Sequence, residues 1–307
     1  MTEPSETPER STREPQMTRL LDNRTLSRLE RLRINSLRRF TDKRRGEHLA
    51  GRSGTSTEFS DYRDYVPGDD VRFVDWNIFA RLNRPYLKLY HTEEEMHVVL
   101  LVDASSSMMF ENKLERALQL AASFTVMGLM GTERVSAAAF NSTGEAPTQI
   151  RRCIGRGSMM KVFRFLEGIE GGGNAPVDDG IETFLKYHVG RGIAVILSDF
   201  LTFGDMRRAF NRLFSSGLET FGLQILGPSE LDPEVAGDVR FVDCETAETL
   251  DVSPGELLGI YQEYREDYQR NLAQLCRQRS GRFVATSTED SLEWVLFDLL
   301  RRRGWIV

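Results

Sequence analysis

Apolar residues along this chain come in blocks that fit strands and helices in turn. Four apolar runs of strand length are the predicted strands 97–102, 134–140, 192–198 and 219–226. The segments between them place apolar residues three and four positions apart, which is the spacing of one helix face. They predict helices at 113–130, 158–167, 177–187 and 205–214. Strands alternating with helices predict the α/β class, with a doubly wound and mainly parallel sheet.

The end of the chain departs from this simple alternation. We predict a small hairpin and a long helix as an insertion at about 237–280, followed by a last strand and a last helix. The expected elements are strands 239–243 and 249–252, helix 255–278, strand 282–285 and helix 291–301. Within the long helix, Tyr261, Tyr264 and Tyr268 recur at helical spacing, and we interpret this stripe as core packing.

The start of the chain is polar and basic. Residues 1–17 hold almost nothing apolar, so we predict a disordered tail. Residues 18–95 form a predicted extension with a basic helix from Thr18, a turn-rich segment and a short edge strand at 86–90. The main domain is expected at 96–307. From 19 to 52, eleven Arg or Lys stand against four acids, although the whole chain has a net charge of −6. Such a segment could contact nucleic acid, a membrane surface or an acidic partner; we favour a solvated helix face that folds back on the acidic body.

Composition excludes several classes of protein. Hydrophobic residues make up 40% and charged residues 28% of the chain, as in ordinary globular proteins. No apolar run approaches the roughly 18 residues of a membrane span, and the polar start lacks an apolar signal core. Three widely spaced cysteines make neither a disulfide framework nor a zinc motif. We therefore expect a cytoplasmic protein.

Oxygen-bearing side chains follow two of the predicted strands. Asp103, Ser105 and Ser107 come directly after the strand at 97–102, and Asp199 ends the strand at 192–198. Ligands of doubly wound sheets gather at the carboxyl ends of strands, so these side chains can face one crevice. A glycine-rich loop, 170–176, could bring the amide oxygen of Asn174 to the same point. Hard oxygen ligands suit Mg²⁺, or Mn²⁺ in its place. The alternative is purely structural: the serines cap a following helix and Asp103 bonds to backbone.

These residues resemble a known motif. Asp103-x-Ser105-x-Ser107, with Asp199 at a later strand end, resembles the metal-ion-dependent adhesion site of von Willebrand factor A domains. The resemblance implies a von Willebrand A-like fold and a metal held by these residues. It also places Asn174 where that family usually has threonine.

A second resemblance covers nearly everything after about residue 45. The chain resembles the bacterial family called domain of unknown function 58 in the residues Tyr62, Arg63, Tyr65, Gly68, Asp69, Asp70, Arg72, Asp75, Trp76, Ala80 and Arg81, and in 241–246. Many members carry two N-terminal membrane helices, where this chain has a basic helix. The resemblance implies a working link with MoxR-type AAA+ ATPases, which are chaperone-like machines.

The charged and aromatic segment that carries this resemblance has two interpretations. Arg63, Asp69, Asp70, Arg72 and Asp75 could line a groove for a partner. We favour a charge-paired clasp that locks the extension to the main domain, with Trp76 buried as a plug.

Two functions of different classes remain open from the sequence. The first is a metal-dependent adaptor, in which an acidic side chain of a client protein completes the coordination of the metal. The second is a magnesium-dependent hydrolase that uses Asp103 and Asp199, with Asp178 or Asp179 as a base. The chain has no phosphate-binding Gly-x-x-x-x-Gly-Lys-Ser/Thr and no Gly-x-Ser-x-Gly, so it does not resemble an ATPase or a serine hydrolase. We favour the adaptor, and nucleic-acid binding by the basic segment is the weakest of the three ideas.

Overall fold

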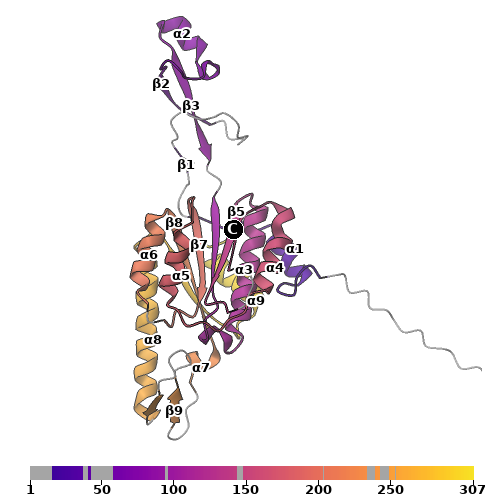
Figure 1. Cartoon of the computed structure of the whole chain (residues 1–307), viewed down its shortest axis with the longest axis vertical. Helices are drawn as coiled ribbons and strands as arrows, with labels where there is room; N and C mark the ends of the chain where they lie inside the picture. The colour runs from indigo at the N-terminus through magenta and orange to yellow at the C-terminus, as the bar shows by residue number, and fades with distance from the viewer. Residues whose placement is uncertain are drawn as a thin grey trace, which may run out of the picture.

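The computed structural model describes residues 16–36, 41–42, 58–93, 96–143, 148–202, 204–233, 239–242, 249–252 and 254–307. Its centre is a six-stranded sheet in the order β11-β8-β7-β4-β5-β6 (Figure 1). Only β6 runs antiparallel, along β5 at one edge. The strands are β4 (His97–Asp103), β5 (Arg134–Phe140), β6 (Gln149–Ile154), β7 (Gly192–Ser198), β8 (Leu218–Leu226) and β11 (Arg282–Ser287). The doubly wound α/β prediction is confirmed, with the strand order of a von Willebrand A-like domain.

Helices cover both faces of the sheet. They are α3 (Lys113–Met130), α4 (Met159–Glu167), α5 (Val177–Leu185), α6 (Met206–Ser215) and α8 (Pro254–Arg277), while the short α7 (Pro228–Leu231) follows the carboxyl end of β8. The chain ends in the short helical segments α9 (Leu292–Trp294) and α10 (Leu300–Arg302), joined by a π-helical turn at Val295–Leu299. The predicted helix at 113–130 and the strands at 134–140 and 192–198 agree with the structure at both ends.

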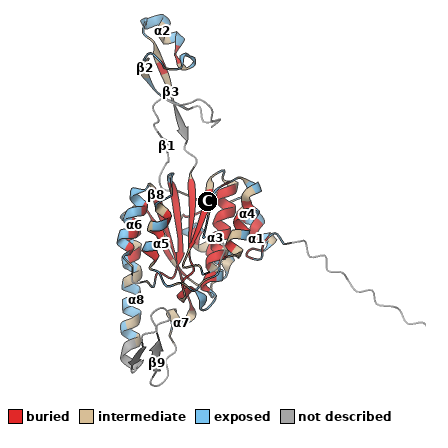
Figure 2. Cartoon of the chain, in the orientation of Figure 1, coloured by how far each residue is buried: buried red, intermediate tan, exposed pale blue. Residues whose placement is uncertain are grey.

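Side chains of the central strand enter two different cores. Val98, Leu100 and Val102 pack towards α3 and α4, while Val99 and Leu101 pack towards α5, α6 and α8. This division follows from the strand geometry, because successive side chains point to opposite faces. An uninterrupted apolar run is therefore the expected sequence of a strand buried on both faces. Figure 2 shows the sheet as the most buried part of the chain.

The N-terminal segment packs against the main domain, but its helix is shorter than predicted. Helix α1 (Asn23–Leu29) begins at the cap residue Asp22, whose carboxylate accepts a hydrogen bond from Thr25 N–H. Its buried leucines join the core beside α3. Arg28 stacks on the Phe297 ring at 3.5 Å, in agreement with a basic face that folds back on the body. Residues 1–15 of the predicted disordered tail, and residues 37–40 and 43–52 of the basic segment, lie outside the described residues.

The extension forms a separate small sheet rather than an edge of the main sheet. Strand β3 (Tyr86–Glu93) pairs with β2 (Glu58–Asp64) and with β1 (Thr41–Asp42), and α2 (Trp76–Leu82) joins them. The predicted strand at 86–90 is present, but the prediction that it is an edge strand was wrong, because β3 lies between β1 and β2. Figure 1 shows this hairpin projecting from the amino-terminal end of β4. It stands at the opposite end of the sheet from the strand ends that hold the candidate site.

The charge pairs of the extension are internal to it. Arg63 makes two hydrogen bonds with Asp69, and Asp75 caps α2 and pairs with Lys88 at 3.1 Å. Trp76 is 61% exposed, because it lies on the outer face of a two-turn helix at the tip. The prediction of a buried tryptophan plug was therefore wrong. The pairs between described residues rigidify the hairpin, and none of these pairs reaches the main domain.

The insertion near the C-terminal end matches its prediction in the part that the structure describes. Strands β9 (Val239–Val242) and β10 (Thr249–Val252) pair as an antiparallel hairpin, and α8 follows. Residues 243–246 of the family resemblance lie outside the described residues. The tyrosine stripe is only half core: Leu272 and Leu275 are buried, but Ile260 and Tyr264 are 64% and 72% exposed. The first half of α8 extends past the sheet edge and has no core to cover it (Figure 1).

The start of β4 makes the stability of the fold sensitive to acid. His97 is buried beside His188, and its Nε2 lies 3.1 Å from Ser136 Oγ. Burial, with a smaller contribution from the charge of His188, lowers the pKa of His97 to about 4. The unfolded chain therefore binds more protons between pH 6.5 and 4, so stability falls as pH drops through that window. We expect His97→Gln to remove about 2 kcal/mol of the loss between pH 7 and pH 4.5, at about 1.36 kcal/mol per pKa unit, because this range covers most of the shift from 6.5 to about 4. Urea unfolding of both proteins at pH 7 and pH 4.5 measures it. Equal losses of unfolding free energy in wild type and His97→Gln between pH 7 and pH 4.5 would contradict the prediction.

Candidate functional site

The candidate site lies at the carboxyl ends of β4 and β7. The chain leaves β4 towards β5 and β6 on one side and returns to β7 on the other, so these two strands flank the point where the winding reverses. Loops diverge at such a point and leave a crevice for a ligand. The loop after β4 carries Asp103, Ser105 and Ser107, and the loop after β7 carries Asp199. The structure thus brings these four predicted residues to one end of the sheet, and the fifth, Asn174, lies at the same end through its bond to Ser106.

Asp103 is held by three hydrogen bonds. Its Oδ1 accepts from Ser105 N–H at 3.0 Å and from Asn141 Nδ2 at 3.2 Å, and its Oδ2 accepts from Ser198 Oγ at 2.6 Å. Only 1% of the residue is exposed. Burial, together with the negative charge of Asp199, raises the pKa of Asp103, while the Ser198 bond opposes the rise. The carboxylate is therefore fixed in position and lies within the electric field of the second carboxylate.

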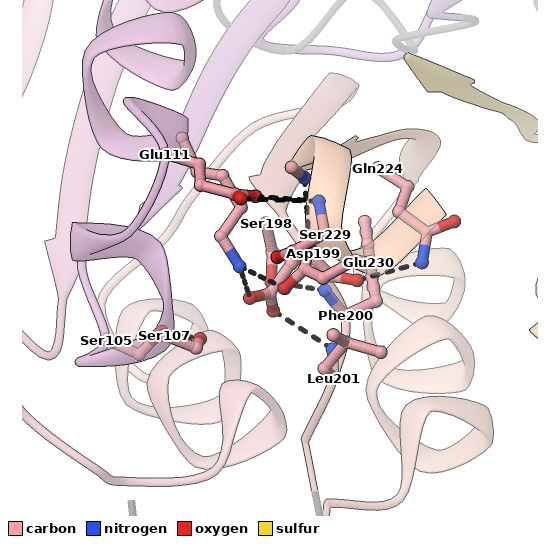
Figure 3. A network of polar contacts seen from close by, with 12 residues as sticks. Ser105, Ser107, Glu111, Ser198, Asp199, Phe200, Leu201, Gln224, Ser229 and Glu230 are labelled. Atoms are coloured by element: carbon pink, nitrogen blue, oxygen red, sulfur yellow. Dashed lines mark hydrogen bonds and ion pairs between the residues drawn. The ribbon is translucent and has the colours of Figure 1, made fainter. Parts of the chain in front are cut away.

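The two serine hydroxyls form a pair beside this carboxylate. Ser105 Oγ and Ser107 Oγ are 3.0 Å apart, and both residues are buried (Figure 3). Magnesium binds six oxygens in an octahedron at 2.0–2.1 Å, so two neighbouring ligands lie about 2.9 Å apart. The serine pair has this separation. The intervening Ser106 points elsewhere and donates to Gly172 O at 2.9 Å.

Asp199 is engaged on both oxygens. Its Oδ1 accepts from Leu201 N–H at 3.0 Å, and its Oδ2 accepts from the Lys113 ammonium at 2.9 Å. The Lys113 ammonium also donates to Glu230 Oε1, at 2.5 Å. Burial alone would lower the pKa of Lys113, but Asp199 and Glu230 outweigh it and raise that pKa. Figure 3 shows this network around Asp199 and Glu230.

Asn174 lies beside the loop that follows β4, where Gly173 pairs with Ser105 as an isolated β-bridge. Asn174 is exposed, and its Oδ1 accepts from Ser106 Oγ at 2.6 Å. The glycine-rich loop is also held by Asn141, which bonds to both the N–H and the carbonyl of Ala175. An amide oxygen committed to Ser106 must turn before it can coordinate an ion. Metal binding by Asn174 remains a prediction.

Four residues of the site were not anticipated from the sequence: Asn141, Ser198, Lys113 and Glu230. Asn141 directly follows β5 and Ser198 ends β7, so the same strand-end rule that selected Asp103 could have selected both. Lys113 and Glu230 carry no such signal. They begin α3 and belong to α7, and only the packing of these two helices brings them to Asp199.

The donor set fits a hard divalent cation by its chemistry and spacing. Two of its carboxylates, Asp199 and Glu230, share the ammonium of Lys113, and the third, Asp103, is buried and bonds to Ser105, Asn141 and Ser198. When all are ionised, the three carboxylates and the ammonium carry a formal charge of −2, which one divalent cation neutralises. The described residues hold no group of three or more His, Cys, Asp or Glu side chains that alone could ligate an ion. The serine hydroxyls are therefore essential members of any metal site here.

Fold and site together define a von Willebrand A-like domain with a polar cluster at its switch point. The chain belongs to the family described as protein of unknown function DUF58, which matches residues 61–277. It is similar to uncharacterized proteins of Mycobacterium tuberculosis and Mycobacterium bovis, each 28% identical over 235 residues, covering 74% of this chain and 71% of the relative. None of the helices in the described ranges is long and apolar enough to span a bilayer.

Solved structures give a weaker likeness. The protein BatB of Bacteroides thetaiotaomicron is 14% identical, with a TM-score of 0.42, over 68% of this chain and 98% of that one. An aerotolerance-related membrane protein of Bacteroides fragilis is 16% identical, with a TM-score of 0.39, over 67% and 99%. The fold assignment therefore rests on the strand order of this chain itself.

Proposed function

We propose that this protein is a metal-dependent, protein-binding adaptor. Asp103, Ser105 and Ser107 would hold Mg²⁺, or Mn²⁺, with Asp199 close by. The bound ion would supply a Lewis-acidic position for a carboxylate oxygen of a client protein. The observation that carries the proposal is the serine pair at 3.0 Å beside a buried carboxylate, at the point where the sheet reverses its winding.

Apolar side chains at the same end of the sheet favour a protein as the ligand. Met109 and Phe110 follow β4, and Leu201 follows β7, and all three are exposed. The first half of α8 adds Ile260 and Tyr264, also exposed. Exposed apolar residues grouped around a polar centre are typical of protein-binding surfaces, in which the rim excludes water from a few strong contacts.

The proposed partner is a MoxR-type AAA+ ATPase, with an acidic client held at the metal. This partner is inferred from the family resemblance, which implies that ATP-driven remodelling and client recognition belong to two separate proteins. The chain has no phosphate-binding loop of its own. Any ATP-driven remodelling would therefore belong to a separate protein, and this chain would supply recognition.

Hydrolysis at the Asp103 and Asp199 site is the alternative, and the placement of its candidate bases disfavours it. A hydrolase needs a base within reach of a metal-bound nucleophile. Asp178 Oδ2 accepts from Asp205 N–H at 3.2 Å, at the start of α6, and Asp179 is exposed. Neither residue shares a hydrogen bond with Asp103, Ser105 or Ser107 among the contacts of the described residues.

The experiment measures binding between the full chain and a MoxR-type ATPase of the same bacterium, with Mg²⁺ and with EDTA. We expect at least fivefold weaker binding in EDTA and in Phe110→Ser, because truncating an interface residue at the centre of a contact typically costs more than 1 kcal/mol. Val189→Ser is the control, since Val189 is also an exposed apolar residue but precedes β7 at the other end of the sheet.

The other outcomes separate the alternatives. Equal affinity in Mg²⁺ and EDTA would keep the partner and overturn the metal contact. No binding to the ATPase, with Mg²⁺-dependent cleavage of para-nitrophenyl phosphate that Asp103→Asn abolishes, would favour the hydrolase.

A further inference from the structure

Lys113 is a lysine in an unusual position. It is the first residue of α3, and only 1% of it is exposed. Lysine is almost never fully buried unless its charge is paired. Here the ammonium contacts two carboxylates, Asp199 and Glu230, at 2.9 and 2.5 Å. One of these two is a candidate metal ligand, so the lysine and a metal would share the same carboxylate.

The contact with Asp199 limits what that residue can offer an ion. Asp199 Oδ1 already accepts from Leu201 N–H, and Oδ2 accepts from Lys113. The ammonium also places a positive charge beside the cluster, where it repels an incoming cation in a poorly solvated site. Lys113 therefore opposes metal binding in two ways, by occupying an oxygen and by its charge.

Glu230 has the opposite effect. It draws the ammonium of Lys113 towards α7 and adds a negative charge to the cluster. Its own position is fixed, because Glu230 Oε2 accepts from Gly227 N–H at 2.8 Å. In addition, the Glu230 carbonyl accepts from Tyr261 Oη at 2.8 Å and from Arg265 Nη1 at 3.1 Å. The Lys113 ammonium thus lies between Asp199, the candidate metal ligand, and Glu230, whose backbone carbonyl bonds to side chains of α8.

We propose that Lys113 and Glu230 form a charge pair that sets the metal affinity of the site, with Lys113 lowering and Glu230 raising the affinity. Lys113 is a positioning residue in this proposal, since it acts on the metal through Asp199. The proposal rests on the proposed metal site. Beyond that site, the proposal states that the metal affinity depends on a contact between α3 and α7, two elements that supply no ligand themselves.

The test titrates the full chain with Mn²⁺ alone and measures the dissociation constant by calorimetry and by electron paramagnetic resonance of free Mn²⁺. Four proteins are compared: wild type, Lys113→Met, Glu230→Gln and the double variant. We expect at least tenfold tighter binding in Lys113→Met and at least threefold weaker binding in Glu230→Gln. The double variant keeps the net charge of the pair and should lie within threefold of wild type.

Opposite changes in Mn²⁺ affinity in the two single variants distinguish this role from a merely structural one. Lys113→Met leaves Asp199 and Glu230 without their shared cation, and Glu230→Gln takes one of the two carboxylates from Lys113, so each variant should be less stable than wild type without metal. A structural role alone would weaken Mn²⁺ binding in both. Should Lys113→Met fail to fold, the double variant and Lys113→Arg, which keeps the charge and should stay within threefold of wild type, carry the comparison with Glu230→Gln.

Each result bears on the proposal. Unchanged or weaker Mn²⁺ binding in Lys113→Met would overturn it. If all Lys113 and Glu230 variants bind like wild type while Asp103→Asn does not bind, this inference fails and the proposed metal site stands. If wild type itself binds no Mn²⁺, both fail.

Discussion

Replacing Asp103 by asparagine should reduce the affinity for Mg²⁺ or Mn²⁺ by more than 100-fold and remove metal-dependent partner binding. Loss of a direct ligand should exceed the 10- to 100-fold typical of residues that only support ligands. The fold should survive, because an asparagine oxygen can still accept from Ser105 N–H, and the Ser198 hydroxyl can accept as well as donate. Calorimetric titration with Mn²⁺, alongside thermal unfolding, measures both effects.

The serine between the two candidate ligands provides the control. Ser106→Ala removes a hydroxyl of the same loop that bonds to Gly172 O and Asn174 rather than to the serine pair. It should leave Mn²⁺ affinity within about threefold, whereas Ser105→Ala or Ser107→Ala should lower it at least tenfold, as expected for lost ligands. Equal effects of all three serine variants would mean that the loop is merely structural and that the metal assignment is wrong.

Replacing Trp305 by alanine should destabilise the fold by about 3–5 kcal/mol, the usual cost of deleting a large buried aromatic side chain. Trp305 is 1% exposed and packs on Phe221 with ring centroids 4.6 Å apart. Its carbonyl accepts from Asn35 N–H, and Arg33 and Val307 exchange two backbone hydrogen bonds. The C-terminal residues thus hold the N-terminal segment on the main domain.

A second tryptophan near the same end tests whether burial is the cause. Trp294→Ala removes a side chain of the same size, but Trp294 is exposed in α9. It should cost less than about 1 kcal/mol, as surface substitutions do. Guanidinium unfolding of the two variants and wild type measures the difference. Similar losses in both variants would contradict the proposed role of Trp305.

The strands and helices of the main domain could be read from the sequence because each has one strong, local signal. The apolar run 98–102 is long enough for a strand and too short for a typical helix, and both of its faces are buried. Helix α3 repeats its apolar residues at three and four positions over eighteen residues. Such patterns depend only on chain geometry, so they do not require knowledge of the partners.

The wrong predictions concern residues whose burial depends on which other elements pack against them. Trp76 and Tyr264 are aromatic residues in patterns that favour a core, yet both are exposed because no other element of the described chain covers them. The sequence specifies which face of α8 is apolar, but not that the first half of α8 passes beyond the sheet edge. The strand at 86–90 was placed correctly along the chain but predicted as an edge strand, whereas it lies between β1 and β2, because pairing partners are not a local property.

The candidate site likewise has a part that the sequence predicts and a part that only the tertiary structure determines. Asp103, Ser105, Ser107 and Asp199 could be selected from the sequence because the strand-end rule links chain position to place in the fold. The spacing of the serine hydroxyls, the commitment of Asn174 to Ser106, and the burial of Lys113 between Asp199 and Glu230 were decided only by the tertiary structure. Lys113 lies 86 positions from Asp199 and 117 positions from Glu230 along the chain, and helix packing brings their charges into contact. No local sequence pattern predicts such a contact.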